Sequence, residues 1–205
     1  MKRHYLMFAS AWLVIAIATT GVGCSSTQIR YYTLVSPPDQ TSPGAQVTLA
    51  IDVRVLHIPA QLKRAELVAR AGPTEVTLLE NERWASPVTD EIRDALRLEL
   101  QRRQGRLSGL QAASTKLTID IDVRHFEAEP GKHALLEASW SADLSGAAQR
   151  TTGTRPAICT FRADERIQTG YAGMVEGYQR EIAALAEAIV AALARSANGS
   201  DVTCH

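Results

Sequence analysis

The acidic and histidine side chains of this chain are not spaced as an enzyme would need them. Asp120 and Asp122 point to the same face of a predicted strand, where paired carboxylates could exchange protons, but we expect them on a solvated outer face. His125 and His133 flank a predicted turn without lying opposite each other, and no third ligand completes a tetrahedral metal site. The sequence has no Gly-x-Ser-x-Gly, His-Glu-x-x-His or glycine-rich phosphate loop. We therefore expect a protein without catalytic residues, metal ligands or a cofactor, which is not an enzyme.

Cys24 is the side chain best placed for chemical modification. Residues 1–23 carry two early cations and then an almost unbroken apolar run, which is typical of an export signal. Cys24 follows Gly21-Val22-Gly23 and precedes Ser25, an arrangement that resembles the lipobox of bacterial lipoproteins. The resemblance implies cleavage before Cys24 and its acylation, with palmitate among the chains, and two or more chains anchor a protein durably.

Two alternatives to lipidation stay open at this point. Gly21 stands where a lipobox usually has Leu, so an ordinary signal peptidase could release a secreted protein. The apolar run could also remain as an uncleaved anchor, although it barely spans a bilayer. In lipoproteins an Asp after the cysteine retains the protein at the inner membrane, so Ser25 implies the outer membrane, facing the periplasm.

The other two cysteines are candidates for a disulfide. An exported chain folds in an oxidising compartment, where Cys159 and Cys204 could pair and tie the C-terminal tail to an internal strand. The alternative is a buried Cys159 and a Cys204 in a frayed tail that never reaches it.

The composition excludes two broad classes of protein. The 205 residues carry 22 Lys and Arg against 22 Asp and Glu, and 45% of them are hydrophobic. A nucleic-acid-binding module would concentrate positive charge, and a disordered chain would have few apolar residues and a large net charge. The length suits one globular domain, which we place at residues 47–205, after the signal peptide (1–23) and a lipidated tether with the first strand (24–46).

Alternating and helical hydrophobic patterns predict the elements that position these residues. The predicted strands are 31–35, 47–55, 65–70, 75–80, 117–124, 136–144 and 157–162, with a turn at 129–132. A helix is predicted from Pro87 to Gly105, with Ser86 as its N-cap, and a second from 171 to 194. We expect an α+β fold with one mostly antiparallel β-sheet and two amphipathic helices packed on one face.

Aromatic residues at the ends of these elements have two interpretations. Neighbouring residues of a strand face opposite ways, so Tyr31 or Tyr32 should point outward, where an early edge strand could bind a partner. The alternative is that both fill the sheet. Trp84 and Trp140 are expected in the core rather than against a ligand.

Several segments, taken in order, resemble one family. They are Cys24 followed by Arg30-Tyr31-Tyr32-Thr33-Leu34, the segment Ile58-Pro59 to Leu62 and Arg64, the strand Glu66-Leu67-Val68-Ala69-Arg70, the segment Asn81-Glu82-Arg83-Trp84-Ala85-Ser86-Pro87, and a strand at 118–126 followed by Ala138-Ser139-Trp140. Together they are similar to the PqiC/YmbA family of ABC-type transport auxiliary lipoproteins.

The resemblance implies a periplasm-facing lipoprotein that supports envelope integrity. Its expected partners are an MCE-domain membrane protein, an integral membrane transport subunit and further copies of itself. Together these would move lipids between the two membranes, with this chain docking the partner tunnel at the outer membrane. The alternative is a cell-envelope assembly or structural lipoprotein that binds a β-barrel or peptidoglycan.

Overall fold

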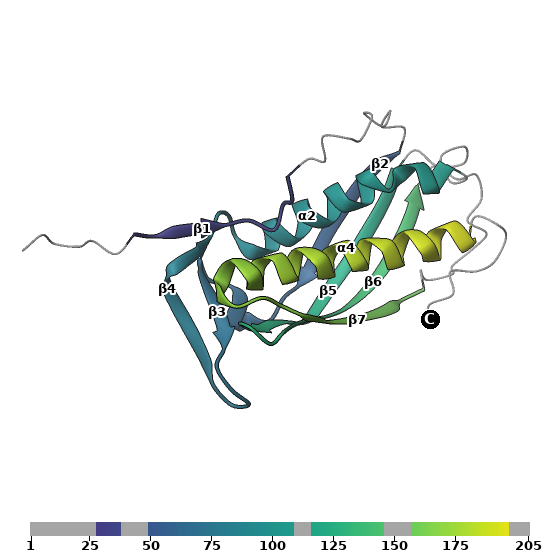
Figure 1. The fold of residues 1–205 in the computed structure, drawn as a ribbon. Coiled ribbons are helices and arrows are strands. Elements are labelled where there is room, and N and C mark those ends of the chain that lie inside the picture. The colour runs from purple at the N-terminus through teal and green to yellow at the C-terminus, as the bar shows by residue number, and fades with distance from the viewer. Residues whose placement is uncertain (1–27, 38–48, 109–115, 146–156, 197–205) are drawn as a thin grey trace, which may run out of the picture.

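The structure is a computed structural model that describes residues 28–37, 49–108, 116–145 and 157–196. Within these ranges the strands are β1 (Arg30–Tyr32), β2 (Ala50–His57), β3 (Glu66–Arg70), β4 (Val76–Trp84), β5 (Lys116–Glu129), β6 (His133–Ser145) and β7 (Cys159–Arg166). The helices are α2 (Val88–Arg102) and α4 (Gly170–Ser196), with short 3-10 turns at Ala60–Leu62 and Gln104–Leu107. Figure 1 shows their arrangement.

The strands form two sheets. A three-stranded sheet has the order β1-β4-β3 and a four-stranded sheet the order β2-β5-β6-β7. Strands β1 and β4, and also β2 and β5, pair in parallel, while the remaining neighbours are antiparallel. The predicted α+β class is confirmed, but the strands are divided between two sheets where we expected one. The reason is that β4 has β1 on one side and β3 on the other, so the β3–β4 hairpin does not join β2.

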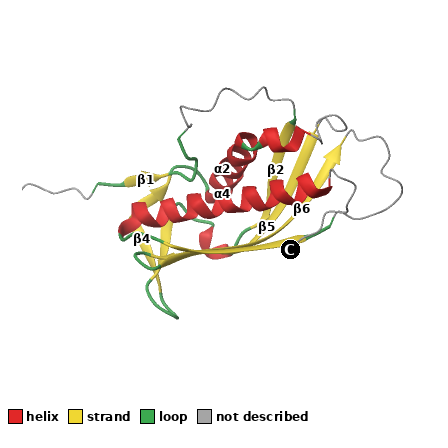
Figure 2. Cartoon of the chain, turned by 45° about the vertical axis from the view of Figure 1, so that its right-hand side comes forward, coloured by secondary structure: helices red, strands yellow, loops and turns green. Residues whose placement is uncertain are grey.

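Both long helices cover the same face of the four-stranded sheet, as predicted (Figures 1 and 2). Helix α2 packs on β2, helix α4 packs on β6 and β7, and the two helices also contact each other. The predicted apolar stripes are buried between the layers: Ile92, Ala95, Leu96 and Leu100 from α2, and Tyr178, Ile182, Leu185, Ile189 and Leu193 from α4. No helix in the described ranges is long and apolar enough to cross a membrane.

The β5–β6 hairpin supplies the centre of the four-stranded sheet. Its predicted alternation is confirmed, because Leu117, Ile119, Ile121 and Val123 are all buried. A bulge between Val123 and His125 then shifts the pairing, so that Phe126 and Ala128 continue the buried face. The turn is tight at Gly131, whose φ of 79° lies in the region that glycine adopts without strain.

Three aromatic rings join the two sheets in the core. Trp84 ends β4 in the three-stranded sheet, Phe126 lies on β5 in the four-stranded sheet, and Tyr178 lies on α4. The rings of Phe126 and Tyr178 stack with centroids 4.0 Å apart, and Trp84 lies 6.5 Å and 6.3 Å from them. The expectation that Trp84 and Trp140 are core residues is confirmed, since both are buried.

Several boundaries differ from the sequence-based expectation. The first strand ends at Tyr32 rather than residue 35, the last runs to Arg166 rather than 162, and the strand predicted from residue 47 is described only from Ala50. Ser86 does not cap helix α2: Pro87 occupies the N-cap position, and no side chain there bonds to the backbone. Ser86 instead donates its hydroxyl to the Glu91 carboxylate, 2.7 Å away, because that acid lies in the first turn and reaches back.

Candidate functional site

Only one of the three cysteines lies among the residues that the structure describes. Cys24 and Cys204 lie outside the described residues. Cys159 begins β7, is only 1% exposed, and takes part in a disulfide. A bonded Cys159 agrees with an exported chain, while its pairing with Cys204 stays a prediction.

Tyr31 and Tyr32 lie on an edge strand, with the opposite orientations that alternation predicts. Strand β1 pairs with β4 alone in the described part of the chain, so its other side is open. Tyr31 is 64% exposed, whereas Tyr32 is half-buried and packs against the core. Burial raises the pKa of the Tyr32 phenol, as does its hydrogen bond with Glu82. One tyrosine therefore faces solvent at the edge, and the other fixes the strand to the domain.

An ion pair strengthens the attachment of β1. The Arg30 guanidinium binds the Glu82 carboxylate, which is buried, directly across the β1–β4 ladder. This contact raises the pKa of Arg30, with the hydrogen bond as the largest cause. Since the Arg30 side chain itself is 60% exposed, the pair orients the strand more than it stabilises the domain.

Glu91 fastens the segment after β1 to the first turn of helix α2. Its buried carboxylate accepts hydrogen bonds from the Thr33 hydroxyl at 2.7 Å and the Leu34 backbone N–H at 2.8 Å. It also accepts two from Ser86, through the backbone N–H at 3.1 Å and the hydroxyl at 2.7 Å. Sequence reasoning did not find these contacts, because the helix dipole favours acids in the first turn of any helix. The serine five residues before Glu91 was the signal for this contact.

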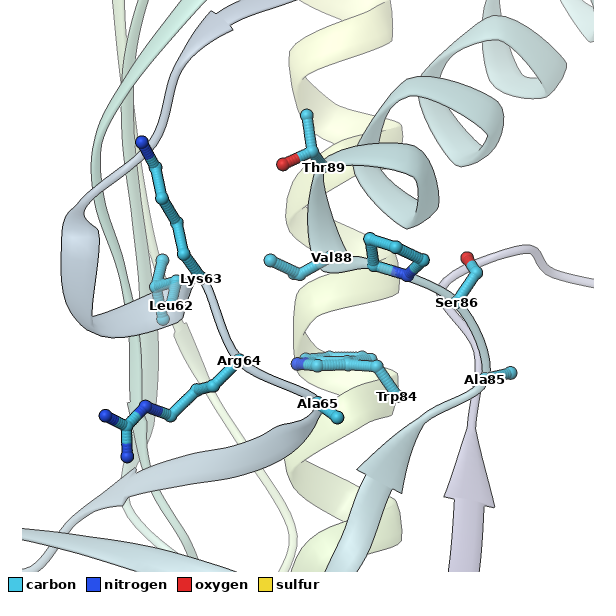
Figure 3. A pocket seen from close by; sticks show the side chains of 10 residues that line it. Leu62, Lys63, Arg64, Ala65, Trp84, Ala85, Ser86, Val88 and Thr89 are labelled. Carbon is cyan, nitrogen blue, oxygen red and sulfur yellow. The ribbon is translucent and has the colours of Figure 1, made fainter.

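A pocket of 460 Å³ lies between the loop that precedes β3 and the start of helix α2 (Figure 3). One wall is formed by residues 62–65 and the other by residues 84–89. These are parts of two of the segments that carry the family resemblance, and the fold brings them together although about twenty residues separate them in the chain. Sequence reasoning did not find this pocket, because an apolar residue predicted to be in the core gives no sign that it also faces a cavity.

The groups that line the pocket are apolar side chains and hydrogen-bond donors. Trp84 and Val88 face the 62–65 loop, and the indole nitrogen lies at the end of the ring that points toward this loop (Figure 3). Lys63 and Arg64 also belong to the lining, but their charged ends point in different directions and that of Arg64 points away from Trp84 (Figure 3). Neither side chain has an ion-pair partner among the described residues. No acidic side chain belongs to the lining.

The histidines and Asp120, which were considered for chemistry, lie in separate contacts with other side chains. Asp120 accepts two hydrogen bonds from Arg54, at 2.6 Å and 2.7 Å. His125 lies 3.6 Å from Glu137, and His133 lies 3.0 Å from Asp164, so the two histidines belong to separate contacts. Among the residues with described positions, no three His, Cys, Asp or Glu side chains gather as metal ligands would.

Comparisons with known proteins agree on one family and one fold. Residues 32–190 match the family model described as the ABC-type transport auxiliary lipoprotein component. A solved structure from Xanthomonas campestris, assigned to the family model DUF330, superposes with a TM-score of 0.55 at 19% identity, covering 83% of this chain and 99% of that one. A crystal structure of an uncharacterised protein superposes with a TM-score of 0.56 at 18% identity, covering 80% and 97%. No curated protein matches the chain.

Proposed function

The chain belongs to the family of ABC-type transport auxiliary lipoprotein components, and on this premise we propose that it is an accessory subunit of an MCE-type intermembrane lipid transport complex. In this proposal it faces the periplasm from the outer membrane and docks the end of a partner tunnel there, which supports envelope integrity. It forms no bonds and breaks none. Its partners are an MCE-domain membrane protein, an integral membrane transport subunit and further copies of itself.

The anchor in this proposal is Cys24, exposed as the new amino terminus when residues 1–23 are removed. Arg30, the first residue of β1, follows Cys24 by only six residues in the sequence. Fully extended, six residues span roughly 20 Å, so an acylated Cys24 would hold the domain close to the bilayer. Such a short tether suits a subunit that positions a partner at the membrane.

The docking surface in this proposal is the open side of β1. An edge strand presents unpaired backbone N–H and C=O groups that another strand can pair with. Tyr31 is 64% exposed on this strand, and an exposed tyrosine offers a large contact area with few rotatable bonds. The observation that carries the proposal is this exposed edge, attached firmly to the domain and only a short tether away from Cys24.

Site-specific crosslinking tests the docking proposal in intact cells. The photoreactive residue p-benzoylphenylalanine replaces Tyr31 in the full chain, and in a control it replaces Thr160, which is exposed on β7. We expect position 31 to crosslink to an MCE-domain protein or to a second copy of the chain, and position 160 to do so much less. If position 31 captured a β-barrel protein or no membrane protein at all, the transport role would be wrong.

Labelling with radioactive palmitate tests the anchor. Wild-type protein should take up the label and sediment with the outer membrane. Cys24→Ala should lose both properties, with Cys204→Ser as a matched cysteine control that keeps them. Label retained by Cys24→Ala would contradict lipidation at this position.

A further inference from the structure

We propose that the β3–β4 hairpin of one copy of this chain inserts into the pocket between residues 62–65 and 84–89 of a second copy. Val76 and Leu78 enter the pocket, and the acids beside them meet the cations at its rim. The proposed function includes further copies of the chain, and this inference rests on it by naming the surfaces through which copies meet. It requires neither lipidation of Cys24 nor docking at the edge of β1.

The hairpin projects from the body of the protein. Figures 1 and 2 show its turn reaching away from the helices and from the four-stranded sheet. Val76 and Leu78 are 53% and 40% exposed, and they share a face of β4 because alternate residues of a strand point the same way. Val68, opposite Leu78 on β3, extends this apolar patch. Exposed apolar side chains that gather in one patch mark a surface that a partner can bury.

Arg70 holds the hairpin in a fixed shape. Its guanidinium donates hydrogen bonds to the carbonyl oxygens of Gly72 and Pro73, at 3.3 Å and 3.2 Å, and so ties the turn to β3. The same guanidinium forms an ion pair with Glu127 on β5, which ties the hairpin to the four-stranded sheet. A hairpin that is already ordered loses little conformational freedom when it binds.

The pocket can receive the two aliphatic side chains. Its volume of 460 Å³ exceeds that of the side chains of a valine and a leucine together. The apolar part of its lining consists of Leu62, Ala65, Trp84, Pro87 and Val88. Ala65 and Pro87 are exposed, so the pocket is open to a neighbouring molecule. Moving Val76 and Leu78 from water onto these walls is favourable, because it buries apolar surface on both partners.

Unpaired charges on the two surfaces are opposite in sign. The exposed acids Glu75 and Glu80 lie on either side of the apolar pair in the sequence, and the exposed Lys63 and Arg64 belong to the pocket lining. None of the four has an ion-pair partner in the part of the chain that the structure describes. The charged ends of Lys63 and Arg64 point in different directions, so each can meet a separate acid (Figure 3). Such complementarity fixes the orientation of a partner and speeds its association.

The positions of the two surfaces determine how copies assemble. Val76 begins β4 and Trp84 ends it, so the hairpin and the pocket lie at opposite ends of one strand. A hairpin that Arg70 holds in place cannot fold back into the pocket of its own chain. Contact between two different surfaces is heterologous, so each copy uses its hairpin on one neighbour and its pocket on another. A pair of copies leaves one hairpin and one pocket free, and assembly continues beyond the dimer.

Sedimentation velocity of the full chain, extracted from its membranes in detergent, tests this arrangement. We expect wild type to form oligomers larger than a dimer. Val76→Ser/Leu78→Ser should weaken self-association about thirtyfold, because two apolar side chains no longer enter the pocket. Ala65→Trp should weaken it similarly, because an indole fills the pocket from an exposed position.

Two control variants match these changes on other surfaces. Val35→Ser/Leu56→Ser alters the same two residue types at exposed positions outside the hairpin. Ala172→Trp places the same ring on an exposed position of helix α4, outside the pocket lining. Both controls should assemble like wild type. Equal losses of self-association in the variants and their controls would contradict the proposed surfaces.

Mixing the two defective proteins gives the sharpest comparison. Val76→Ser/Leu78→Ser keeps an intact pocket, and Ala65→Trp keeps an intact hairpin. Equal amounts of the two should therefore form a 1:1 dimer and nothing larger, since one functional contact remains. A mixture that stays monomeric, or a wild type that is itself monomeric, would overturn the inference. In either case, crosslinking of position 31 to an MCE-domain protein would still support the transport role.

Exchanging the charges tests the orientation of the contact. Lys63→Glu/Arg64→Glu and Glu75→Lys/Glu80→Lys should each weaken self-association, because like charges then face each other across the contact. Combining all four substitutions in one chain should restore assembly. A combined variant that assembles no better than the two parent variants would show that these charges do not meet.

Discussion

Glu91 shows how a single carboxylate can hold three parts of this chain together. It lies in helix α2, and its hydrogen-bond donors come from the segment after β1 and from the residue before the helix. Four donors on one buried carboxylate offset the cost of removing its charge from water. The placement of the amino-terminal segment therefore depends on this one side chain.

Replacing Glu91 should destabilise the domain strongly. Glu91→Ala leaves the buried Leu34 N–H and the Ser86 groups without an acceptor, and we expect a loss of about 3–5 kcal/mol in the free energy of unfolding. Glu91→Gln should cost less because an amide oxygen still accepts. Urea unfolding measures both variants against Glu80→Ala, an exposed acid on β4 whose loss should change stability by less than about 0.5 kcal/mol. Similar losses for Glu91→Ala and Glu80→Ala would contradict this role.

Glu181 is the opposite case, a buried acid without such support. Its side chain is 0% exposed, and neither carboxyl oxygen makes a hydrogen bond of normal geometry. Burial raises its pKa from 4.5 to about 8, and the nearby charges of Glu165 and Asp164 add to this shift. The backbone of Leu136 and the charge of Arg180 oppose it. At neutral pH Glu181 is therefore mainly a protonated acid.

The raised pKa of Glu181 predicts how stability changes with pH. Between pH 4.5 and about 8 the folded protein holds a proton that the unfolded chain has released, so raising the pH favours unfolding. The slope is about 1.4 kcal/mol per pH unit for one proton. Glu181→Gln should remove this slope, so that its advantage over wild type grows from pH 5 to pH 8 in urea unfolding. Parallel stability curves for the two proteins would show that Glu181 is not the titrating group.

At the scale of elements, strand β1 has one face for the domain and one for solvent. Tyr32 packs on the core, so Tyr32→Ser should lower the free energy of unfolding by about 2 kcal/mol or more. Tyr31 is exposed, so Tyr31→Ser should change stability by less than about 0.5 kcal/mol. If β1 is the docking edge, Tyr31→Ser should nevertheless weaken copurification of the partner. A Tyr31→Ser protein that unfolds as easily as Tyr32→Ser would show that the strand has no free face.

Local patterns predicted the elements well because each depends on neighbouring residues. The alternation around Ile119 and Ile121 and the helical spacing of Ile182 and Leu185 place these side chains on the buried faces where we expected them. Which strands pair depends instead on contacts between distant segments. Strand β4 pairs with β1 across about fifty residues, and nothing in either pattern specifies that choice.

The candidate site was predictable only in part, for the same reason. The opposite orientations of Tyr31 and Tyr32 followed from strand geometry alone. The hydrogen bonds of Glu91 and the pocket beside Trp84 arise where segments distant in the sequence meet, so single-segment patterns missed them. Trp84 illustrates the limit: its burial was expected, but the direction of its ring nitrogen was not.

At the scale of the whole molecule, the disulfide of Cys159 links β7 to a segment outside the described residues. If the partner is Cys204, the bond closes a loop of roughly 45 residues and stabilises the protein by about 2–4 kcal/mol. Cys204→Ser should then expose one free thiol in denatured, unreduced protein and lower stability by that amount. Reduced wild type is the matched control for the stability loss. A free thiol that appears in Cys24→Ala instead would identify Cys24 as the partner and contradict both the pairing and the lipidation.

The short ladder of β1 also gives the protein a mechanical property. A pull on the amino terminus first loads three paired residues and the exposed Arg30–Glu82 contact, whereas the next fastening point is the buried carboxylate of Glu91. The side chains of Arg30 and Tyr31 lie mostly outside the core, so these two residues can separate from β4 while Tyr32 still packs against the core and the layers stay intact. The start of the first strand would thus lengthen the tether under tension before the domain itself begins to unfold.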